Sequence, residues 1–281
     1  MYLLKACRPL QWIKNGVIFL PCIFAIDHIP RSLYLSLLDL ICVSIAFCCM
    51  SSAVYLFNDL MDREIDSKHP LKKDRPIASG NLNPKIATIA STILMLGGII
   101  GTAFIQPLLI IPSIIYLTVN IGYSLGIKRI VILDIFSVAS GYLIRIVAGA
   151  WTIQVEPSEW LYVTTGVAAL FIVIGRRYAE VRLTPSHKRR EVLKGYTNDL
   201  VTQLMIISAS AAFLSYTLYT VEKGMILTLP SVAFGLFRYV YLLNTNSRAE
   251  SPEHLIVHDI PLIAGILSWI FISAIVIFTL R

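Results

Sequence analysis

Three residues with oxygen-bearing side chains recur at every fourth position after an apolar stretch. Asn58, Asp62 and Asp66 directly follow the apolar run from Leu33 to Phe57, which is long enough to cross a bilayer. If a helix continues past Phe57, this spacing places the three side chains in one line on one face. Oxygen ligands that include carboxylates suit Mg²⁺, which takes water and phosphate as its other ligands. The spacing therefore predicts a Mg²⁺ site formed by these three side chains.

A basic loop follows the acidic residues. It contains Lys68, His69, Lys72, Lys73 and Arg75. Basic side chains gathered in this way suit phosphate oxygens. A metal held by carboxylates beside such a loop indicates a diphosphate site, in which Asp62 and Asp66 act through the metal and Arg75 neutralises charge directly. The alternative is a solvated loop in which acids and bases only pair with each other, an interpretation that leaves the regular spacing unexplained.

The composition indicates which kind of protein positions these residues. The 281 residues are 56% hydrophobic and 15% charged, and the mean hydropathy is +0.73, as is typical of polytopic membrane proteins. The net charge of +7 could indicate nucleic-acid binding, but the basic residues lie in alternate loops between apolar runs, which argues against a nucleic-acid partner. The five cysteines show no C-x-x-C spacing, so we predict neither a disulfide framework nor a cysteine metal site.

We predict an all-α fold in which nine apolar runs cross the membrane within a single domain over residues 1–281. The runs cover residues 16–29, 33–57, 84–105, 107–126, 130–152, 159–175, 200–221, 225–243 and 258–280. Most of the 24 Lys and Arg residues lie at the N-terminus and in the loops after the second, fourth, sixth and eighth runs. By the positive-inside rule, the N-terminus and both long charged loops face the cytoplasm and the C-terminus lies outside.

A second charged group lies around the start of the fifth run and comprises Tyr123, Lys128, Asp134 and Arg145. A charge inside a membrane span is costly unless it faces a partner or a wet cavity, so Asp134 and Arg145 are candidate functional residues. They are three helical turns apart, so they share a face but cannot pair directly. Two simpler interpretations stay open: Lys128 as a topology marker and Arg145 as part of a structural ion pair.

A third charged group lies at the end of the sixth run and comprises Arg176, Arg177, Tyr178 and Glu180. Two adjacent arginines point to different sides of a helix, so one can face the lipid surface while the other faces a cavity. The alternative interpretation is an anchor that follows the positive-inside rule.

The acidic residues and the basic loop together resemble the UbiA superfamily of intramembrane prenyltransferases. The matching patterns are Asn-Asp-x-x-Asp-x-x-x-Asp from Asn58 and Arg-Pro-x-x-Ser-Gly from Arg75. Within the superfamily, residues 8–15, 69–80 and 134–145 look most like the decaprenyl-phosphate phosphoribosyltransferase branch. The resemblance implies a nine-helix bundle in a bacterial inner membrane, around a central cavity open to the cytoplasmic side.

This chain departs from the usual superfamily pattern at the end of the sixth run. Prenyl-diphosphate users in the superfamily usually have a second acidic motif there, whereas this chain has the mostly basic stretch 176–182. Arginines suit direct binding of another phosphate and suit a second metal poorly. One more residue than is typical separates Tyr123 from Lys128.

The resemblance implies Mg²⁺-dependent transfer of 5-phosphoribosyl from phosphoribosyl diphosphate to a polyprenyl phosphate, for synthesis of cell-envelope pentose polymers. Asp62, Asp66, Arg75 and Lys128 are the expected catalytic residues, since they stabilise the charge of the departing diphosphate. The residues expected to bind the substrates are Lys14, His69, Lys72, Tyr123, Asp134, Arg145, Arg176, Arg177, Tyr178 and Glu180.

Two rival functions stay open. A prenyltransferase that joins a polyprenyl diphosphate to an aromatic acceptor would use the same Mg²⁺ motif, but it predicts a second acidic cluster. A transporter predicts charged groups near the membrane midplane and broken helices in related halves. In this chain most of the charge collects at one face of the membrane. A homo-oligomer is compatible with either membrane enzyme.

Overall fold

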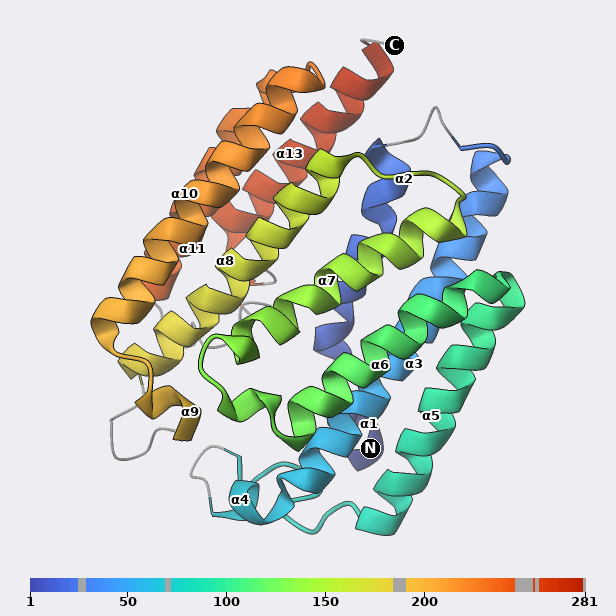
Figure 1. The fold of residues 1–281 in the computed structure, drawn as a ribbon, viewed down its shortest axis with the longest axis vertical. Coiled ribbons are helices and arrows are strands. Elements are labelled where there is room, and N and C mark those ends of the chain that lie inside the picture. The colour runs from blue at the N-terminus through green and yellow to red at the C-terminus, as the bar shows by residue number, and fades with distance from the viewer. Residues whose placement is uncertain (25–28, 69–71, 184–190, 246–254, 256–257, 280–281) are drawn as a thin grey trace. The chain divides into compact units, whose positions relative to one another are not determined.

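The computed structural model describes residues 1–281 except 25–28, 69–71, 184–190, 246–254, 256–257 and 280–281. In this part of the chain the regular elements are helices and no strand occurs, so the prediction of an all-α fold is confirmed (Figure 1). The long helices are α3 (Leu33–Met61), α5 (Pro84–Ile105), α6 (Ile110–Leu125), α7 (Leu133–Thr152), α8 (Glu159–Leu183), α10 (Asn198–Glu222), α11 (Leu229–Thr245) and α13 (Ile260–Thr279).

Eight helical segments among the described residues are long and apolar enough to cross a membrane, and each overlaps one of these long helices. The prediction of an integral membrane protein is therefore supported. Of the remaining predicted span, 16–29, residues 16–24 form the end of the 3₁₀ helix η1 (Pro9–Phe19) and the short helix α2 (Leu20–Phe24), and residues 25–28 lie outside the described part. The count of nine spans and the opening of a central cavity to the cytoplasm stay predictions.

The chain divides into two compact units. Unit 1 contains residues 1–128 and 140–157, and unit 2 contains residues 129–139 and 158–281. Helix α7 begins in unit 2 and ends in unit 1. The prediction of a single domain over the whole chain stays a prediction.

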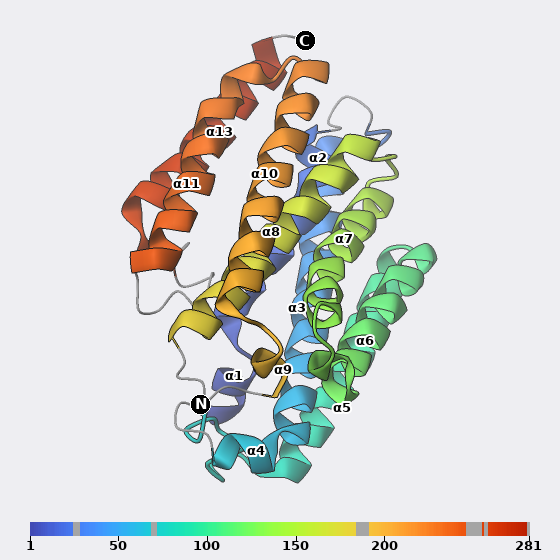
Figure 2. The same cartoon turned by 60° about the vertical axis from the view of Figure 1, so that its left-hand side comes forward.

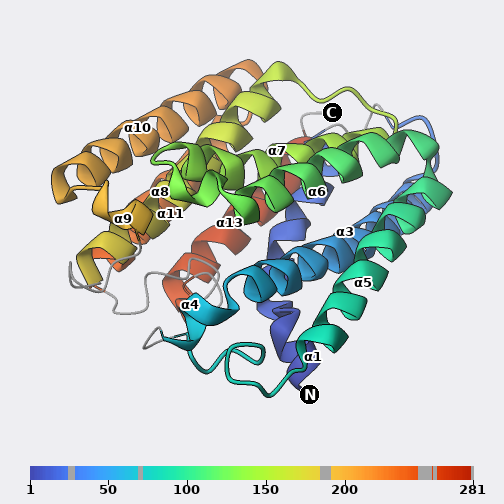
Figure 3. The ribbon, with the colours of Figure 1, turned by 60° about the horizontal axis from the view of Figure 1, so that its bottom comes forward.

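Unit 1 is built on α3, which packs against α5, α6 and η1 (Figures 1 and 3). Helix α3 begins where the Ser32 hydroxyl accepts a hydrogen bond from the backbone N–H of Leu35, and α5 begins at Asn83 with Pro84 as its first residue. Buried side chains of α3, including Phe47 and Met50, form the core. The short helices α1 (Tyr2–Ala6) and α4 (Arg63–Ser67) lie at the end where α3 terminates, so the N-terminal segment lies beside the acidic residues (Figures 1 and 2).

Unit 2 contains α8 and α10, which run antiparallel along each other, and α11 and α13, which form a second antiparallel pair (Figure 2). Helix α10 begins where the Thr197 hydroxyl accepts a hydrogen bond from the backbone N–H of Leu200. Inside the unit, the Tyr216 hydroxyl accepts from Trp269 at 2.7 Å and lies 2.6 Å from the Thr228 hydroxyl. These two hydroxyl groups and the indole are thus paired, as a membrane interior favours.

We predict that Gly149→Ala destabilises unit 1, because a Cβ atom on α7 at this position would lie 2.0 Å from the backbone carbonyl oxygen of Ile18. Backbone cannot yield as a flexible side chain can, so the cost is about 1–3 kcal/mol of unfolding free energy. Thermal unfolding of the purified protein in detergent measures the effect. Gly97→Ala is the matched control, since its Cβ would meet nothing within 4 Å and alanine favours helix by about 0.5–1 kcal/mol. Equal melting temperatures for the two variants would contradict the prediction.

Candidate functional site

The first candidate site lies where α3 ends. Asp62 separates α3 from α4 and has φ −93° and ψ 4°, so the helix is interrupted there. The backbone N–H of Asp62 nevertheless donates to the carbonyl of Asn58 at 2.9 Å, and that of Asp66 donates to the carbonyl of Asp62 at 2.8 Å. Hydrogen bonds from a backbone N–H to the carbonyl four residues earlier therefore continue through the interruption. They keep the three predicted ligands in helical register.

Asn58 and Asp62 share one cation, the ammonium group of Lys128. Lys128 Nζ lies 2.6 Å from Asp62 Oδ1 and 3.3 Å from Asn58 Oδ1. The Asn58 amide also donates to Asp62 Oδ2 at 3.2 Å, which orients the two side chains toward each other. Lys128 belongs to the 3₁₀ turn η4 (Ile127–Arg129), which follows α6, so residues 66 or more positions apart in sequence meet here.

Asp66 has other partners. Its carboxylate is buried and accepts a hydrogen bond from Arg75 Nη1 at 2.6 Å, and Lys72 Nζ lies 3.9 Å away. The basic loop therefore turns back onto the acidic residues. In the described parts of the chain no group of three or more His, Cys, Asp or Glu side chains is placed to hold a metal. The set of Asn58, Asp62 and Asp66 as metal ligands stays a prediction.

The donor atoms fit a hard cation. Asn58 Oδ1 and Asp62 Oδ1 already enclose one positive charge, that of Lys128 Nζ, and both are oxygen donors of the kind that Mg²⁺ prefers. These two side chains would hold the ion, with Asp66 as the third predicted ligand.

Asp59 and Arg8 belong to the same cluster, and sequence reasoning missed both. The Asp59 carboxylate is buried, and its Oδ1 accepts from Arg8 Nη2 at 2.5 Å and from Arg75 Nη1 at 3.0 Å. Asp59 lies one residue past Asn58, so it points about 100° away from the predicted ligand face and meets a different set of partners. This difference in direction around the helix is the sequence signal that could have separated Asp59 from the predicted metal ligands.

Arg145 is buried in α7 among neutral acceptors. Its guanidinium donates to Asn15 Oδ1 at 2.7 Å, to the Gly141 carbonyl at 2.7 Å and to the Tyr116 hydroxyl at 3.1 Å, and it lies over the Tyr116 ring. In the portion that the structure describes, no carboxylate oxygen lies within the 4.0 Å that defines an ion pair with Arg145. The described residues therefore give no support to the interpretation as a structural ion pair, which stays open. Sequence reasoning also missed Asn15, although it lies in the stretch 8–15.

Asp134 is the centre of a separate cluster in unit 2. Its carboxylate has no exposed surface and accepts from Arg177 Nε at 2.7 Å and from the Tyr196 hydroxyl at 2.6 Å. Arg177 also pairs with Glu180, whose Oε1 accepts from Arg176 Nε at 3.1 Å. Both arginines thus contact Glu180, although Arg177 is buried and the Arg176 side chain is 39% exposed.

Tyr196 joins this cluster to the turn before α7. Its hydroxyl accepts a hydrogen bond from the backbone N–H of Ile132 at 2.7 Å. Ile132 has φ 72°, which is unusual for a β-branched residue, so this bond holds a strained backbone in place. Burial of the phenol, together with its hydrogen bond to the Asp134 carboxylate, raises the pKa of Tyr196 above its usual value.

The remaining predicted residues lie as follows. Tyr178 donates to Asn244 Oδ1 at 2.7 Å, and Arg182 contacts both of them. Lys14 and Tyr123 are half-buried, and His69 lies outside the described residues. The structure therefore brings Asn58, Asp62, Asp66, Lys72, Arg75 and Lys128 together in unit 1. It brings Asp134, Arg176, Arg177 and Glu180 together in unit 2.

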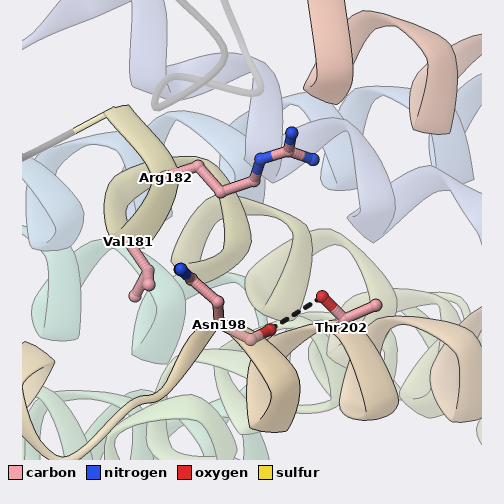
Figure 4. A pocket seen from close by; sticks show the side chains of 4 residues that line it. All are labelled: Val181, Arg182, Asn198 and Thr202. Carbon is pink, nitrogen blue, oxygen red and sulfur yellow. Dashed lines mark hydrogen bonds between the residues drawn. The ribbon is translucent and has the colours of Figure 1, made fainter.

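A pocket of about 330 Å³ lies between the end of α8 and the start of α10 (Figure 4). It is lined by Val181, Arg182, Asn198 and Thr202, and the Thr202 hydroxyl donates to the backbone carbonyl of Asn198 at 2.7 Å. The arginine side chain extends away from the two α10 residues, so they do not form one binding group (Figure 4). None of the four residues named as lining this pocket is a predicted site residue.

Comparison with known proteins identifies the family. Residues 19–260 match the UbiA prenyltransferase family, and the chain belongs to it. The decaprenyl-phosphate phosphoribosyltransferase of Mycobacterium tuberculosis is 30% identical over 274 residues, which cover 95% of this chain and 91% of that protein. The protein of the same name from Corynebacterium glutamicum is 29% identical and covers 96% of this chain and 84% of its own length.

A solved structure supports the fold. A UbiA homolog from Archaeoglobus fulgidus, bound to DMAPP and Mg²⁺, superposes with a TM-score of 0.72 at 14% identity, over 99% of this chain and 100% of that chain. The predicted UbiA-type fold is therefore confirmed, and so is the resemblance to the phosphoribosyltransferase branch.

We predict that Asp134→Asn lowers the unfolding free energy by about 3 kcal/mol or more, because it removes the charge that compensates buried Arg177. Thermal or denaturant unfolding in detergent measures the change. Glu222→Gln is the matched control, since that carboxylate is 47% exposed and, among the described residues, forms an ion pair with the exposed Lys223 alone. A loss no larger than that of the control would show that Arg177 is compensated in another way.

The pH dependence of stability tests the role of Tyr196. Its pKa is raised in the folded protein, so folding favours the neutral phenol, and this stabilisation is complete below the ordinary tyrosine pKa of 10.0 and declines as pH rises above it. We therefore expect wild type to lose melting temperature more steeply than Tyr196→Phe between pH 9 and pH 11. Tyr196→Phe is expected to be less stable at pH 7, so the two curves converge at high pH. Parallel curves would contradict the assignment.

Proposed function

We propose that this chain transfers 5-phosphoribosyl from phosphoribosyl diphosphate to a polyprenyl phosphate in the membrane. The observation that supports it most directly is the cluster at the end of α3, where Asn58 and Asp62 face Lys128 while Asp66 faces Arg75. Oxygen ligands for a metal and cations for phosphate oxygens thus occur side by side. The names of the relatives, which are about 30% identical over most of the chain, support the choice of substrates.

The charges of the cluster suit a departing diphosphate. When bound, Mg²⁺ would neutralise part of the negative charge that develops on the leaving group. Lys128 and Arg75 would donate to the diphosphate oxygens, and they are held in place beforehand by Asp62 and Asp66. The acceptor phosphate is itself an anionic nucleophile, so its attack on the anomeric carbon requires no strong general base. Attack opposite the leaving group would invert that carbon.

The balance of charges suggests which residue binds a phosphate other than the leaving diphosphate. Among the described residues, Arg176 and Arg177 face two carboxylates, Asp134 and Glu180, so these four charges balance. Arg145 has neutral partners and keeps its full positive charge inside unit 1. Arg145 is therefore the better candidate to attract the phosphate of the lipid or of the phosphoribosyl group, and Lys14 and Tyr123 are proposed to complete substrate binding in unit 1. A substrate contact of Tyr178, which belongs to unit 2, stays a separate prediction.

We also retain the proposed topology, with the N-terminus and both charged loops in the cytoplasm of a bacterial inner membrane. Water-soluble phosphoribosyl diphosphate would then reach the cluster from the cytosol, and the product would serve cell-envelope pentose polymers. The alternative, a UbiA-type prenyltransferase with an aromatic acceptor, has the support of the family as a whole. It is the weaker proposal, because Glu180 near the end of α8 is bound by two arginines.

The proposal is tested with purified protein in detergent, Mg²⁺, a polyprenyl phosphate and labelled phosphoribosyl diphosphate. We expect label to enter the lipid phase with wild type and to stop entering when a chelator removes the metal. Asp62→Asn is expected to lower the rate at least about a hundredfold, since it removes a charged metal ligand.

Asp39→Asn is the matched control for this assay. It makes the same carboxylate-to-amide change on α3, but Asp39 pairs with Arg31 near the start of that helix, so transfer should continue at nearly the wild-type rate. No transfer by wild type, together with activity on a prenyl diphosphate and an aromatic acid, would overturn the proposed substrates and leave the family assignment intact.

A further inference from the structure

Asp59 is a buried carboxylate at the proposed site that neither the metal nor the substrate assignments use. One of its oxygens, Oδ1, accepts hydrogen bonds from two arginines, Arg8 at 2.5 Å and Arg75 at 3.0 Å. Arg75 uses the same nitrogen, Nη1, to reach Asp66 at 2.6 Å. Two guanidinium groups that repel each other in water are therefore held side by side by a single carboxylate oxygen.

The side of Asp59 on the helix separates it from the predicted metal ligands. Asn58 and Asp62 are directed to Lys128, whereas Asp59 is directed to the N-terminal segment and to the basic loop. A carboxylate whose negative charge is already shared by two guanidinium groups attracts a metal ion less strongly, because the nearby positive charges repel the ion. Asp59 is better suited to hold cations in place.

Two side-chain contacts and an unusual backbone conformation fix the position of Arg8. Its guanidinium lies 4.9 Å above the centre of the Tyr55 ring while it donates to Asp59. Its backbone has φ 53° and ψ 65°, a left-handed conformation that is uncommon for a residue other than glycine. The side chain still exposes 28% of its surface, so the positioned guanidinium can contact a ligand.

We propose that Asp59 is a positioning residue that holds Arg8 and Arg75 side by side, and that Arg8 is a further residue that binds the diphosphate of the donor. This inference rests on the proposed diphosphate site. The cluster then presents four cations, Arg8, Lys72, Arg75 and Lys128, to three carboxylates, so it carries a net positive charge toward an anionic ligand. The N-terminal segment becomes part of the site through one side chain.

Equilibrium binding of inorganic diphosphate with Mg²⁺ to the full-length protein in detergent tests the proposal. We expect Asp59→Asn to weaken binding at least about tenfold, because the two arginines lose the negative charge that holds them side by side. Arg8→Gln should weaken it about tenfold, and Arg8→Lys, which keeps the charge, should restore most of the affinity. The double variant Asp59→Asn with Arg8→Gln should be little weaker than Asp59→Asn alone, since the two act together. Asp39→Asn is the control and should bind as wild type does.

A purely structural role predicts a different pattern. It would lower the melting temperature and the amount of active protein, while the remaining folded protein would bind diphosphate with unchanged affinity. That result for Asp59→Asn would overturn the proposal. If Asp59→Asn does not fold, the Arg8 variants decide, and an Arg8→Gln affinity within twofold of wild type would overturn it equally.

Diphosphate binding does not depend on which group is transferred. If wild type transfers no phosphoribosyl but the variants weaken diphosphate binding as expected, the proposed function fails and this inference stands. If wild type transfers phosphoribosyl while the variants leave both the diphosphate affinity and the KM for phosphoribosyl diphosphate unchanged, the inference fails and the function stands.

Discussion

A charged side chain buried in a membrane-spanning protein must be compensated, and this constraint explains the arrangement of both candidate sites. Asp59, Asp66 and Asp134 are each at most 3% exposed, and each accepts a hydrogen bond from an arginine. Removing a charge from water costs several kcal/mol, which a well-aligned opposite charge or a set of hydrogen bonds must offset. The acidic residues of α3 therefore depend on the basic loop and on the N-terminal segment for their placement.

Arg145 satisfies the same constraint differently. Three neutral oxygens, from Asn15, Gly141 and Tyr116, accept its hydrogen bonds, and the Tyr116 ring faces its guanidinium. Hydrogen bonds to neutral groups reduce the cost of desolvation but leave the net charge in place. In the described part of unit 2, by contrast, two arginines face two carboxylates, so these four charges balance. The two clusters differ in net charge because the fold brings neutral oxygens to Arg145 and carboxylates to Arg176 and Arg177.

Much of the fold could be predicted from the sequence, because hydrophobic runs and their polar boundaries determine where helices cross a membrane. The cluster of Asp66 with Arg75 and Lys72 lies within one short segment, so local spacing sufficed to group these residues. The contacts of Arg8 with Asp59 and of Asn15 with Arg145 join positions 51 and 130 residues apart. No periodicity within a helix predicts such pairs, since they depend on how the N-terminal segment packs against α3 and α7.

The pairing within the α3 cluster also bears on how it could accept both a cation and an anion. Lys128 with Asp62, and Arg75 with Asp66, are ion pairs whose partners have opposite preferences for the proposed ligands. The carboxylates would turn to a divalent cation, and the ammonium and guanidinium groups to diphosphate oxygens. Because the proposed ligands have opposite charges, each group would exchange one partner for another and none would be left buried without compensation. Binding either ligand alone would leave one set of side chains unpaired, so the electrostatics favours joint binding of metal and diphosphate.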